Sequence, residues 1–194
     1  MLDRAKAVGT CGPVRWQLAD AMSLPFDDAS FDVVACQFGA MFFPDKVRAF
    51  AEARRVLRRD GVLVFNVWDR IEENDFAHTV TKALAECFPA DPPRFMARMP
   101  HGCFDRETIL DDLAGGGFRA APGFETMAAR SRAASAWVPA VARCLGTPLR
   151  NEIEARSGAS LVEATAARGD AIARRFGDGP VDGRIRARIL TARR

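Results

Sequence analysis

Two runs of apolar residues separated by a helical pattern constrain the fold of this chain more than any other feature of its sequence. Residues 31–38 contain the run V-V-A-C, and residues 62–68 read V-L-V-F-N-V-W. Such runs, which lack polar alternation, are typical of strands buried on both faces. Between them, residues 45–59 place apolar side chains on one stripe, with Asp45 as the expected N-cap and Asp60-Gly61 as the expected end of the helix. A strand, a helix and a strand with short joints predict a right-handed crossover in a parallel sheet, and therefore an α/β fold.

The rest of the chain is predicted to add strands on both sides of this unit and several helices after it. Before the unit we expect the end of a helix over residues 2–7, a strand over 14–18 and a loop over 23–30. After it we expect the following elements: helices near 76–88, 135–145, 148–156 and 159–176, a short helix from Asp105, a proline-rich loop over 89–100, and strands near 124–132 and 184–191. We find no internal repeat, so we expect a single domain over 1–194 with a helical insertion before the C-terminal strands.

Composition excludes several classes of protein. The chain has 194 residues, of which 48% are hydrophobic and 27% charged, which is the composition of a globular domain rather than of a disordered chain. No apolar run approaches the roughly 20 residues needed to cross a membrane. The N-terminus is charged and has no apolar stretch typical of a signal peptide, so we expect a cytoplasmic protein.

Charge argues against a nucleic-acid partner. The net charge is +3, and Arg residues are distributed along the chain and mixed with Asp and Glu. The densest Arg groups lie in residues 54–59 and 184–188, where we expect them on solvated faces of a helix and of a strand. Phosphate contact is the alternative interpretation of both groups, and a steep salt dependence of binding would be its signature.

Cysteine and histidine spacing indicates no dedicated metal site. The five cysteines (Cys11, Cys36, Cys87, Cys103 and Cys144) form no C-x-x-C pair, and the two histidines lie too far apart for a helical two-histidine zinc site. The run Gly115-Gly116-Gly117 follows a predicted helix and precedes a predicted strand, which favours a turn over a phosphate-binding loop.

The stretch from residue 14 to residue 68 resembles the class I S-adenosylmethionine-dependent methyltransferases, in the group that includes quinone-biosynthesis C-methyltransferases. The resemblance rests on three ordered segments, D-A-M-S-L-P-F at 20–26, F-D-V-V at 31–34 and E-A-R-R-V-L-R-R-D-G at 52–61. The residues M-L-D-R-A at 1–5 also resemble the segment that follows the second strand of the family. The family implies a Rossmann-like sheet with strand order 3-2-1-4-5-7-6 and helices on both faces. It also implies a partial cofactor-binding core over 1–75 and a variable substrate segment with the C-terminal strands over 76–194.

The resemblance further implies where S-adenosylmethionine would bind. Asp20 would accept a hydrogen bond from the adenine amino group, and Ala21 and Met22 would line the adenine pocket. The other cofactor residues it implies, near the methionine part, are Gln37, Phe38 and Gly39. Open α/β sheets bind ligands beyond the carboxyl ends of their strands, where both groups are expected. A turn-capping role for Asp20 and core positions for Met22 and Phe38 are the structural alternatives.

One part of the family pattern is missing from the sequence. The glycine-rich loop of the D-x-G-C-G-x-G type, and the acidic residue that follows the second strand, have no counterpart in these 194 residues. We therefore expect a sheet truncated at the N-terminus, without the first two strands of the family, and Met1 as an internal methionine or the first residue of a truncated gene. Residues 14–18 are then predicted to pair beside residues 31–38 or with another chain, and cofactor affinity is expected to suffer.

The predicted reaction is transfer of a methyl group to a carbon, oxygen or nitrogen atom of a small molecule. Phe42, Phe43 and Trp68 are the candidate apolar walls of the substrate site, under the segment 76–100. No catalytic residue can be assigned from the sequence: His78 or His101 is a candidate base, and each is also compatible with an ordinary packed or surface position. The alternative is a non-catalytic remnant that associates through an open sheet edge, including with a second copy. A nicotinamide oxidoreductase is disfavoured because no G-x-G-x-x-G segment opens a helix.

Overall fold

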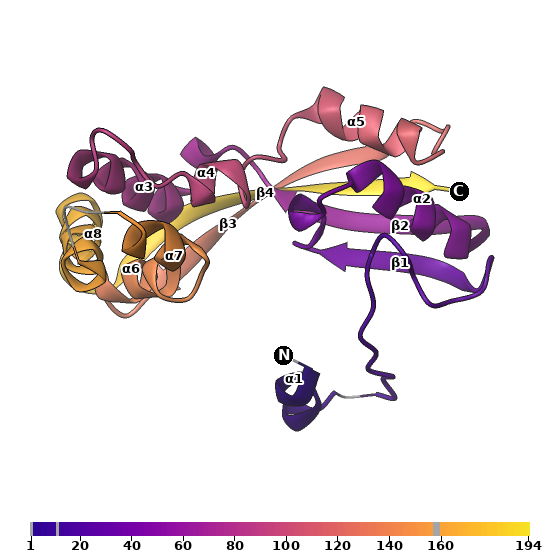
Figure 1. Ribbon diagram of the computed structural model, residues 1–194, viewed down its shortest axis with the longest axis horizontal. Coiled ribbons are helices and arrows are strands. Elements are labelled where there is room, and N and C mark those ends of the chain that lie inside the picture. The colour runs from indigo at the N-terminus through magenta and orange to yellow at the C-terminus, as the bar shows by residue number, and fades with distance from the viewer. Residues whose placement is uncertain (1, 11, 157–159) are drawn as a thin grey trace.

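The computed structural model describes residues 2–10, 12–156 and 160–194, which form one mixed sheet with helices at its two ends (Figure 1). The strands are β1 (Phe31–Gln37), β2 (Leu57–Trp68), β3 (Gly123–Ala133) and β4 (Val181–Arg193). Their order in the sheet is β1-β2-β4-β3, with β1 and β2 parallel and the other two pairs antiparallel. This order matches the 4-5-7-6 end of the sheet that the resemblance implies, so the predicted Rossmann-like α/β fold is confirmed.

The helices follow the predicted pattern closely after residue 31. They are α1 (Leu2–Val8), α2 (Lys46–Val56), α3 (Asp75–Cys87), α4 (Phe95–Arg98), α5 (Arg106–Gly115), α6 (Trp137–Cys144), α7 (Leu149–Glu154) and α8 (Leu161–Phe176), with short 3-10 turns η1 (Ala40–Phe42) and η2 (Ile71–Glu73). The expected start of the last helix at Ala159 lies outside the described residues, as do Met1 and Cys11. Helix α1 lies apart from the sheet in Figure 1.

The crossover β1–α2–β2 is confirmed, with two corrections. Strand β1 lies at the edge of the described sheet and none of its residues is buried, so the predicted burial of this run on both faces is wrong. The second correction concerns the end of the helix. Asp45 is the N-cap, and its carboxylate accepts the backbone N–H of Arg48 at 2.9 Å. The helix ends at Val56, earlier than the predicted Asp60-Gly61, because Leu57 already pairs with Phe31 of β1. Asp60 adopts a φ of 66° inside β2, where the register shifts between the first pairs of the two strands. Strand pairing therefore overrides the helical pattern in this segment.

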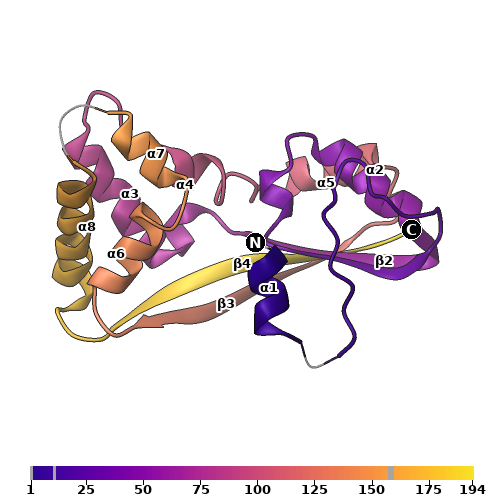
Figure 2. The ribbon, with the colours of Figure 1, turned by 60° about the horizontal axis from the view of Figure 1, so that its bottom comes forward.

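Helices α3, α6 and α8 lie at one end of the sheet and α2 and α5 at the other, as Figure 2 shows, and the two groups pack against opposite faces of β4. Side chains alternate along a strand, so Leu190 and Val181, nine positions apart in β4, point to opposite faces. Leu190 packs with helices α2 and α5 in one core cluster, together with Leu63 and Phe65 of β2. Val181 packs with helices α3, α6 and α8 in a second cluster. The long strand β4 thus joins two helical layers, and the prediction of helices on both faces is confirmed.

The predicted strand over Val14–Leu18 is wrong. These residues pair with no described strand, and the side chains of Val14 and Leu18 are 50% and 84% exposed. The segment that follows is held on α2 instead of on the edge of β1. Arg48 donates to the carbonyl of Met22 at 3.0 Å, and Arg55 donates to the carbonyls of Leu24 and Phe26. These long-range contacts lead the chain away from the edge with which residues 14–18 were expected to pair.

The predicted proline-rich loop over 89–100 contains a helix, α4, that a distant residue stabilises. The carboxylate of Glu152 in α7 accepts the backbone N–H groups of Arg94 and Phe95 and also binds the Arg98 side chain. The cap therefore comes from more than 50 residues away in the chain. A local pattern cannot reveal such a cap.

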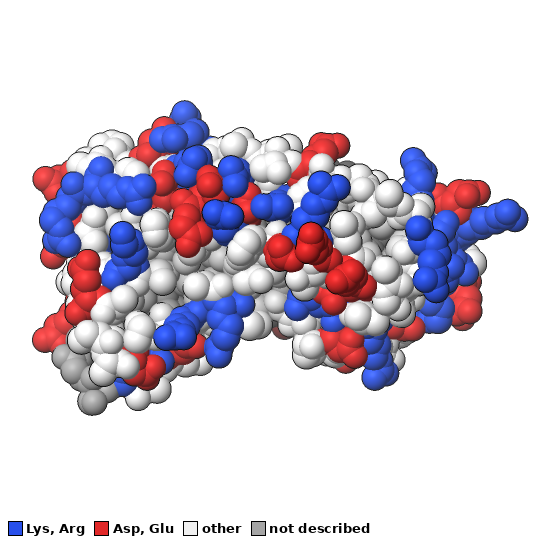
Figure 3. All heavy atoms as spheres, turned by 90° about the horizontal axis from the view of Figure 1, so that it is seen from above, with Lys and Arg blue, Asp and Glu red and all other residues white. Residues whose placement is uncertain are grey.

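Most arginines of the two dense Arg groups pair with carboxylates, and two of them bind a buried one, which corrects the expectation of simple solvated faces. Arg58 and Arg59 belong to β2 rather than to the helix, and Arg58 pairs with Asp32. Arg186 and Arg188 of β4 both bind the buried Asp69. On the face seen in Figure 3, basic and acidic side chains are interspersed. None of the helices in the described part of the chain has the length and hydropathy that crossing a bilayer requires.

Candidate functional site

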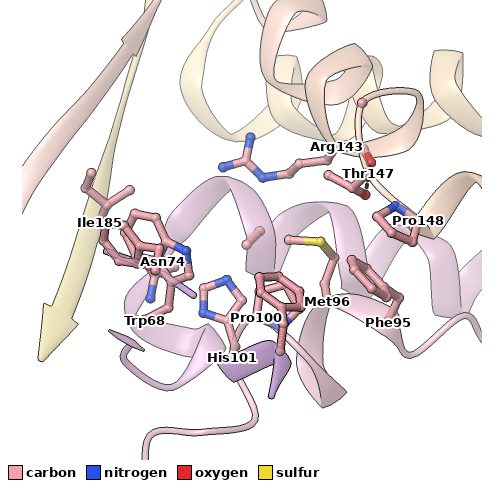
Figure 4. A pocket seen from close by; sticks show the side chains of 14 residues that line it. Trp68, Asn74, Phe95, Met96, Pro100, His101, Arg143, Thr147, Pro148 and Ile185 are labelled. Carbon is pink, nitrogen blue, oxygen red and sulfur yellow. Dashed lines mark hydrogen bonds between the residues drawn. The ribbon is translucent and has the colours of Figure 1, made fainter. Parts of the chain in front are cut away.

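A cavity of about 400 Å³ lies beyond the carboxyl ends of β1 and β2 and reaches between helices α3, α4 and α6. We call it the central cavity. Of the 14 residues that line it, six determine its shape and chemistry: Phe38, Trp68, Phe95, Met96, His101 and Arg143 (Figure 4). Its size and its largely apolar wall with a few polar groups are typical of sites for small molecules.

Two stacked aromatic rings form the wall at the ends of the strands. Phe38 follows β1 directly and stacks on Trp68, the last residue of β2, with ring centroids 4.1 Å apart and ring planes 19° apart. Phe38 has a φ of 49°, a conformation that bulky side chains rarely adopt. The structure holds it there because its N–H donates to Oδ1 of Asn66 at 2.9 Å. Backbone in such conformations is concentrated at binding sites.

His101 brings a neutral imidazole into the cavity. Its side chain is 4% exposed, and Nδ1 lies 2.9 Å from the backbone carbonyl oxygen of Asp69. Because a carbonyl only accepts hydrogen bonds, Nδ1 carries the proton and Nε2 keeps its lone pair. Burial lowers the pKa of His101, the Asp69 carbonyl opposes that shift, and the positive charge of Arg143 lowers the pKa further. The ring is therefore a potential proton acceptor at neutral pH.

A buried ion cluster supports the segment that carries this carbonyl. The Asp69 side chain is inaccessible to solvent and binds Arg186 at 2.6 Å and Arg188 at 2.9 Å. Its Oδ1 also accepts the N–H of Arg70 at 2.8 Å. Burial raises the pKa of Asp69, but the Arg70 amide and the two guanidinium groups outweigh it and hold the pKa below its usual range. Asn74 joins the cluster by donating to the carbonyls of Asp69 and Arg186.

Arg143 enters the cavity from α6 with part of its hydrogen-bonding capacity unused. Its Nη1 donates to the carbonyl of Pro139 at 3.1 Å, whereas Nε is buried without a hydrogen-bond partner. The guanidinium carbon lies 5.6 Å from the centre of the Phe76 ring. Burial lowers the pKa of Arg143 to about 10, which leaves the side chain charged at neutral pH.

The structure places the predicted substrate residues in two neighbouring hollows. Phe42 and Trp68 line the central cavity, together with Phe38, which was expected to contact the cofactor. Phe43 lines an adjoining hollow, to which Phe42 also contributes, so these residues do not form one wall. His78 lies in a surface hollow on α3 and α8, away from His101. Of the two candidate bases, only His101 therefore faces the central cavity.

The predicted cofactor residues lie in separate local structures. Asp20 is exposed, and its Oδ1 accepts the N–H of Met22 at 2.9 Å in a tight turn that includes Ala21. Gln37 is exposed at the end of β1 and contributes to a shallow hollow with Val64 on the sheet. Gly39 begins η1, and a Cβ at this position would lie 2.9 Å from Sγ of Cys36. A side chain at position 39 would therefore distort the end of β1.

Sequence reasoning missed several cavity residues, notably Asn74, Phe95, Met96 and Arg143. Arg143 alone carried a usable signal, because it is the only charged residue in the α6 sequence W-V-P-A-V-A-R-C. An isolated charge on an apolar helix indicates either a buried ion pair or a ligand contact. Over the described ranges 2–10, 12–156 and 160–194, we find no group of three or more His, Cys, Asp or Glu side chains arranged to hold a metal ion.

Comparison with known proteins agrees with the fold. Residues 1–65 match a family described as a methyltransferase domain. The chain is 41% identical over 54 residues to the ubiquinone/menaquinone biosynthesis C-methyltransferase UbiE of Citrifermentans bemidjiense, which covers 28% of this chain and 23% of that protein. It is 46% identical over 66 residues to the demethylmenaquinone methyltransferase of Deinococcus radiodurans, which covers 33% of this chain and 27% of that protein.

A longer match is to a methyltransferase that acts on a different kind of acceptor. The malonyl-[acyl-carrier protein] O-methyltransferase of Geobacter sulfurreducens is 33% identical over 108 residues, covering 56% of this chain and 39% of that protein. The chain thus spans well under half the length of the curated relatives it matches. In three dimensions it resembles a protein of Anaeromyxobacter dehalogenans provisionally assigned as a type II methyltransferase, with a TM-score of 0.57, 17% identity, and coverage of 93% of this chain and 72% of that one.

The sheet order and the cavity beyond the strand ends define a Rossmann-like methyltransferase fold. Over residues 1–65 the sequence is similar to the class I S-adenosylmethionine-dependent methyltransferases, of the type that includes the quinone-biosynthesis C-methyltransferases. The cofactor of this family is S-adenosylmethionine.

Proposed function

We propose that this chain takes part in methyl transfer from S-adenosylmethionine to a small molecule bound in the central cavity. One observation carries the proposal: the cavity begins where the parallel strands β1 and β2 end, and the buried His101 faces it with an unprotonated Nε2. Ligands of open α/β sheets bind in this position. The apolar wall excludes water, which methyl transfer requires because water competes as the acceptor.

The proposed cofactor contacts come from two separate segments, the turn at Asp20 and the end of β1. Asp20 is exposed and has only Oδ1 engaged, so Oδ2 is available to accept a hydrogen bond from an adenine amino group. At the end of β1, Gly39 carries no side chain, Gln37 is exposed, and Phe38 stacks on Trp68 in the cavity wall. We propose that Ala21 and Met22 complete the adenine side. When bound, S-adenosylmethionine supplies an electrophilic methyl group on a positively charged sulfur.

We further propose that residues 1–75 carry the cofactor side and residues 76–194 the variable substrate side of one domain. The central cavity supports this division because both parts contribute to it. Phe42 and Trp68 come from the first part, and His101 and Arg143 from the second. Strand β4 then joins the two parts by pairing with β2 and carrying Ile185 into the same cavity.

His101 is the proposed base of the reaction. With Nδ1–H bound to the Asp69 carbonyl, Nε2 takes the proton from an acceptor hydroxyl as the oxygen forms its bond to the methyl carbon. The bound cofactor would supply this methyl group, and its sulfur would keep the electron pair of the carbon–sulfur bond. The aromatic wall holds the acceptor in line, and such positioning supplies much of the rate enhancement in reactions of this kind.

Binding of S-adenosylmethionine to the 194-residue chain is the first test. Because these residues contain no glycine-rich loop, we expect weak binding in isothermal titration, and we expect Asp20→Ala to weaken it by about tenfold through loss of one hydrogen bond to a charged group. Asp27→Ala, an exposed substitution in the following loop, is the matched control. No heat at millimolar cofactor, or equal loss in both variants, would contradict the proposal.

An association module is the alternative function, and the exposed sheet surface next to β1 favours it. Among the described residues, β1 pairs with β2 alone, so its other edge is open. Val33 is 57% exposed on that strand, and Ala35 beside it is also exposed. Open edges with apolar side chains attract a further strand. The occupant we propose in this case is the β1 edge of a second copy.

Solution mass decides this alternative. If two β1 edges pair, light scattering coupled to gel filtration should give a dimer, and Val33→Lys should convert it to a monomer because charge on an edge strand opposes pairing. Val47→Lys, on the exposed side of α2, is the control. A monomer at all accessible concentrations would rule out the association module in this form.

The four described cysteines are free, and we propose a reducing, cytoplasmic compartment for either function.

A further inference from the structure

The Arg143 side chain is the one cation in the central cavity, and its charge has no partner among the described residues. Three other partly buried arginines meet carboxylates: Arg186 and Arg188 bind Asp69, and Arg55 binds Glu52. Arg54 of α2 shares with Arg143 a buried Nε without a hydrogen-bond partner, but it lines none of the hollows described above. No described carboxylate lies within ion-pair distance of Arg143. A charge removed from water without a partner is costly, so its retention in an apolar wall calls for a reason.

The unused donors of Arg143 lie on one edge of its guanidinium group. Nη1 is engaged by the Pro139 carbonyl, whereas neither Nε nor Nη2 donates to a described residue. Nε–H and Nη2–H point the same way and together form a fork that matches the two oxygens of a carboxylate. Figure 4 shows the guanidinium reaching over the cavity, with His101 on the opposite side of the view.

Arg168 shows what a purely structural buried arginine looks like in this chain. It is completely buried, and its two terminal nitrogens donate to the carbonyls of Ala164 and Ala83. Arg168 therefore fixes α8 against α3, although its Nε, like that of Arg143, is buried without a hydrogen-bond partner. Arg143 has one such carbonyl contact, is partly exposed, and lines the cavity. What distinguishes Arg143 is that its Nη2 also donates to no described residue and that its side chain lies in the wall of the cavity.

We propose that Arg143 binds a carboxylate of the methyl acceptor, which makes the acceptor a small, flat, apolar acid that also carries a hydroxyl. The aromatic wall of Phe38 and Trp68 suits a planar ring, and a cavity of about 400 Å³ accommodates one or two rings with their substituents. The carboxylate pairs with the Nε and Nη2 edge of Arg143 while the hydroxyl meets Nε2 of His101. The identity of this ligand as the acceptor rests on the proposed function, but its binding does not.

Binding of a matched pair of probes, 3-hydroxybenzoate and its uncharged amide 3-hydroxybenzamide, tests the proposal without any methyl transfer. The two probes share ring and hydroxyl and differ in the charge presented to Arg143. We expect ligand-observed NMR titration of the full chain to show the acid binding about 10- to 100-fold more tightly than the amide, the contribution of a paired charge in a desolvated site. Arg143→Gln should bring this ratio to about one.

Two further variants separate recognition from folding. Arg150→Gln removes a cation from the exposed pair with Glu154 and should leave the ratio unchanged. Arg143→Lys keeps the charge without the fork and should retain a reduced preference for the acid, which provides the test should the Gln variant fail to fold. Equal binding of acid and amide by the wild type, or an unchanged ratio in either Arg143 variant, overturns the proposal. Because no cofactor is present, a failure of methyl transfer leaves this readout intact.

Discussion

Replacing His101 with Gln is expected to lower the rate of methyl transfer to a hydroxyl acceptor by about 10²- to 10⁴-fold, the range that a positioned general base contributes. Gln keeps a donor that can bind the Asp69 carbonyl, so the packing around the cavity changes little. The substitution removes the lone pair that Nε2 of His101 presents to the cavity in the wild type. Cofactor affinity should stay within about twofold of wild type, because the change removes no proposed cofactor contact.

The pH profile distinguishes this role from a structural one. Burial lowers the pKa of His101 from its ordinary value of about 6.5, so the ring stays neutral down to a lower pH than a free histidine. The wild-type rate should therefore hold through pH 6.5 and fall as pH drops through the lowered pKa. In the Gln variant this acidic limb should disappear. A variant that keeps the limb, or loses less than about tenfold in rate, would contradict the assignment of His101.

The free energy of unfolding should fall at acidic pH, as the rate of methyl transfer does. Below about 6.5 the unfolded chain protonates His101 while the folded chain resists protonation, so the unfolded state binds more protons. The contribution is present above the unfolded pKa and is lost as pH falls through the folded pKa. His78→Gln is the matched control, since His78 lies in a surface hollow away from the cavity. Chemical denaturation at several pH values measures the free energy of unfolding of the wild type, His101→Gln and His78→Gln.

The parts of the fold that were predictable are those that short-range pattern determines. The two apolar runs of β1 and β2, the capped helix between them and the alternation in β4 are each legible over about ten residues. The error at Val14–Leu18 has a different origin. That segment alternates like a strand, but a strand exists only where a partner accepts its backbone, and Arg48 and Arg55 draw the following residues onto α2. Local pattern carries no information about that competition.

The candidate site divides in the same way. Trp68 and Phe42 were predictable because they follow the ends of strands that the sequence reveals. Arg143 and Asn74 were not predictable, because their positions depend on how helices α3 and α6 pack over β4. Asn74, for example, exchanges hydrogen bonds with Arg186 of β4, which lies more than 100 residues further along the chain. The choice between His78 and His101 also needed the structure, because neither local sequence indicates that only His101 is enclosed.

Replacing Asp69 with Ala should produce the largest loss of stability of any single change considered for this chain. Two guanidinium groups and a backbone N–H converge on this inaccessible carboxylate. Its removal leaves Arg188 without its anion and Arg186 with Glu73 alone, both in a partly buried place, and breaking a buried pair typically costs about 3–5 kcal/mol. That is a large share of the roughly 5–15 kcal/mol that stabilises a domain, so the variant should be largely unfolded at moderate temperature.

Asp182 offers a control with the same composition and a different environment. It also binds two arginines, Arg130 and Arg132, but all three side chains are between 42% and 77% exposed. Surface pairs contribute about 0–1 kcal/mol, so Asp182→Ala should barely shift the denaturant midpoint. The lowered pKa of Asp69 adds a pH signature: its contribution is present above the unfolded pKa of about 3.9 and is lost as pH falls through the folded value. Equal effects of the two substitutions would mean that burial does not set the strength of the Asp69 cluster, and that the carbonyl holding His101 owes its position to the backbone of β2 alone.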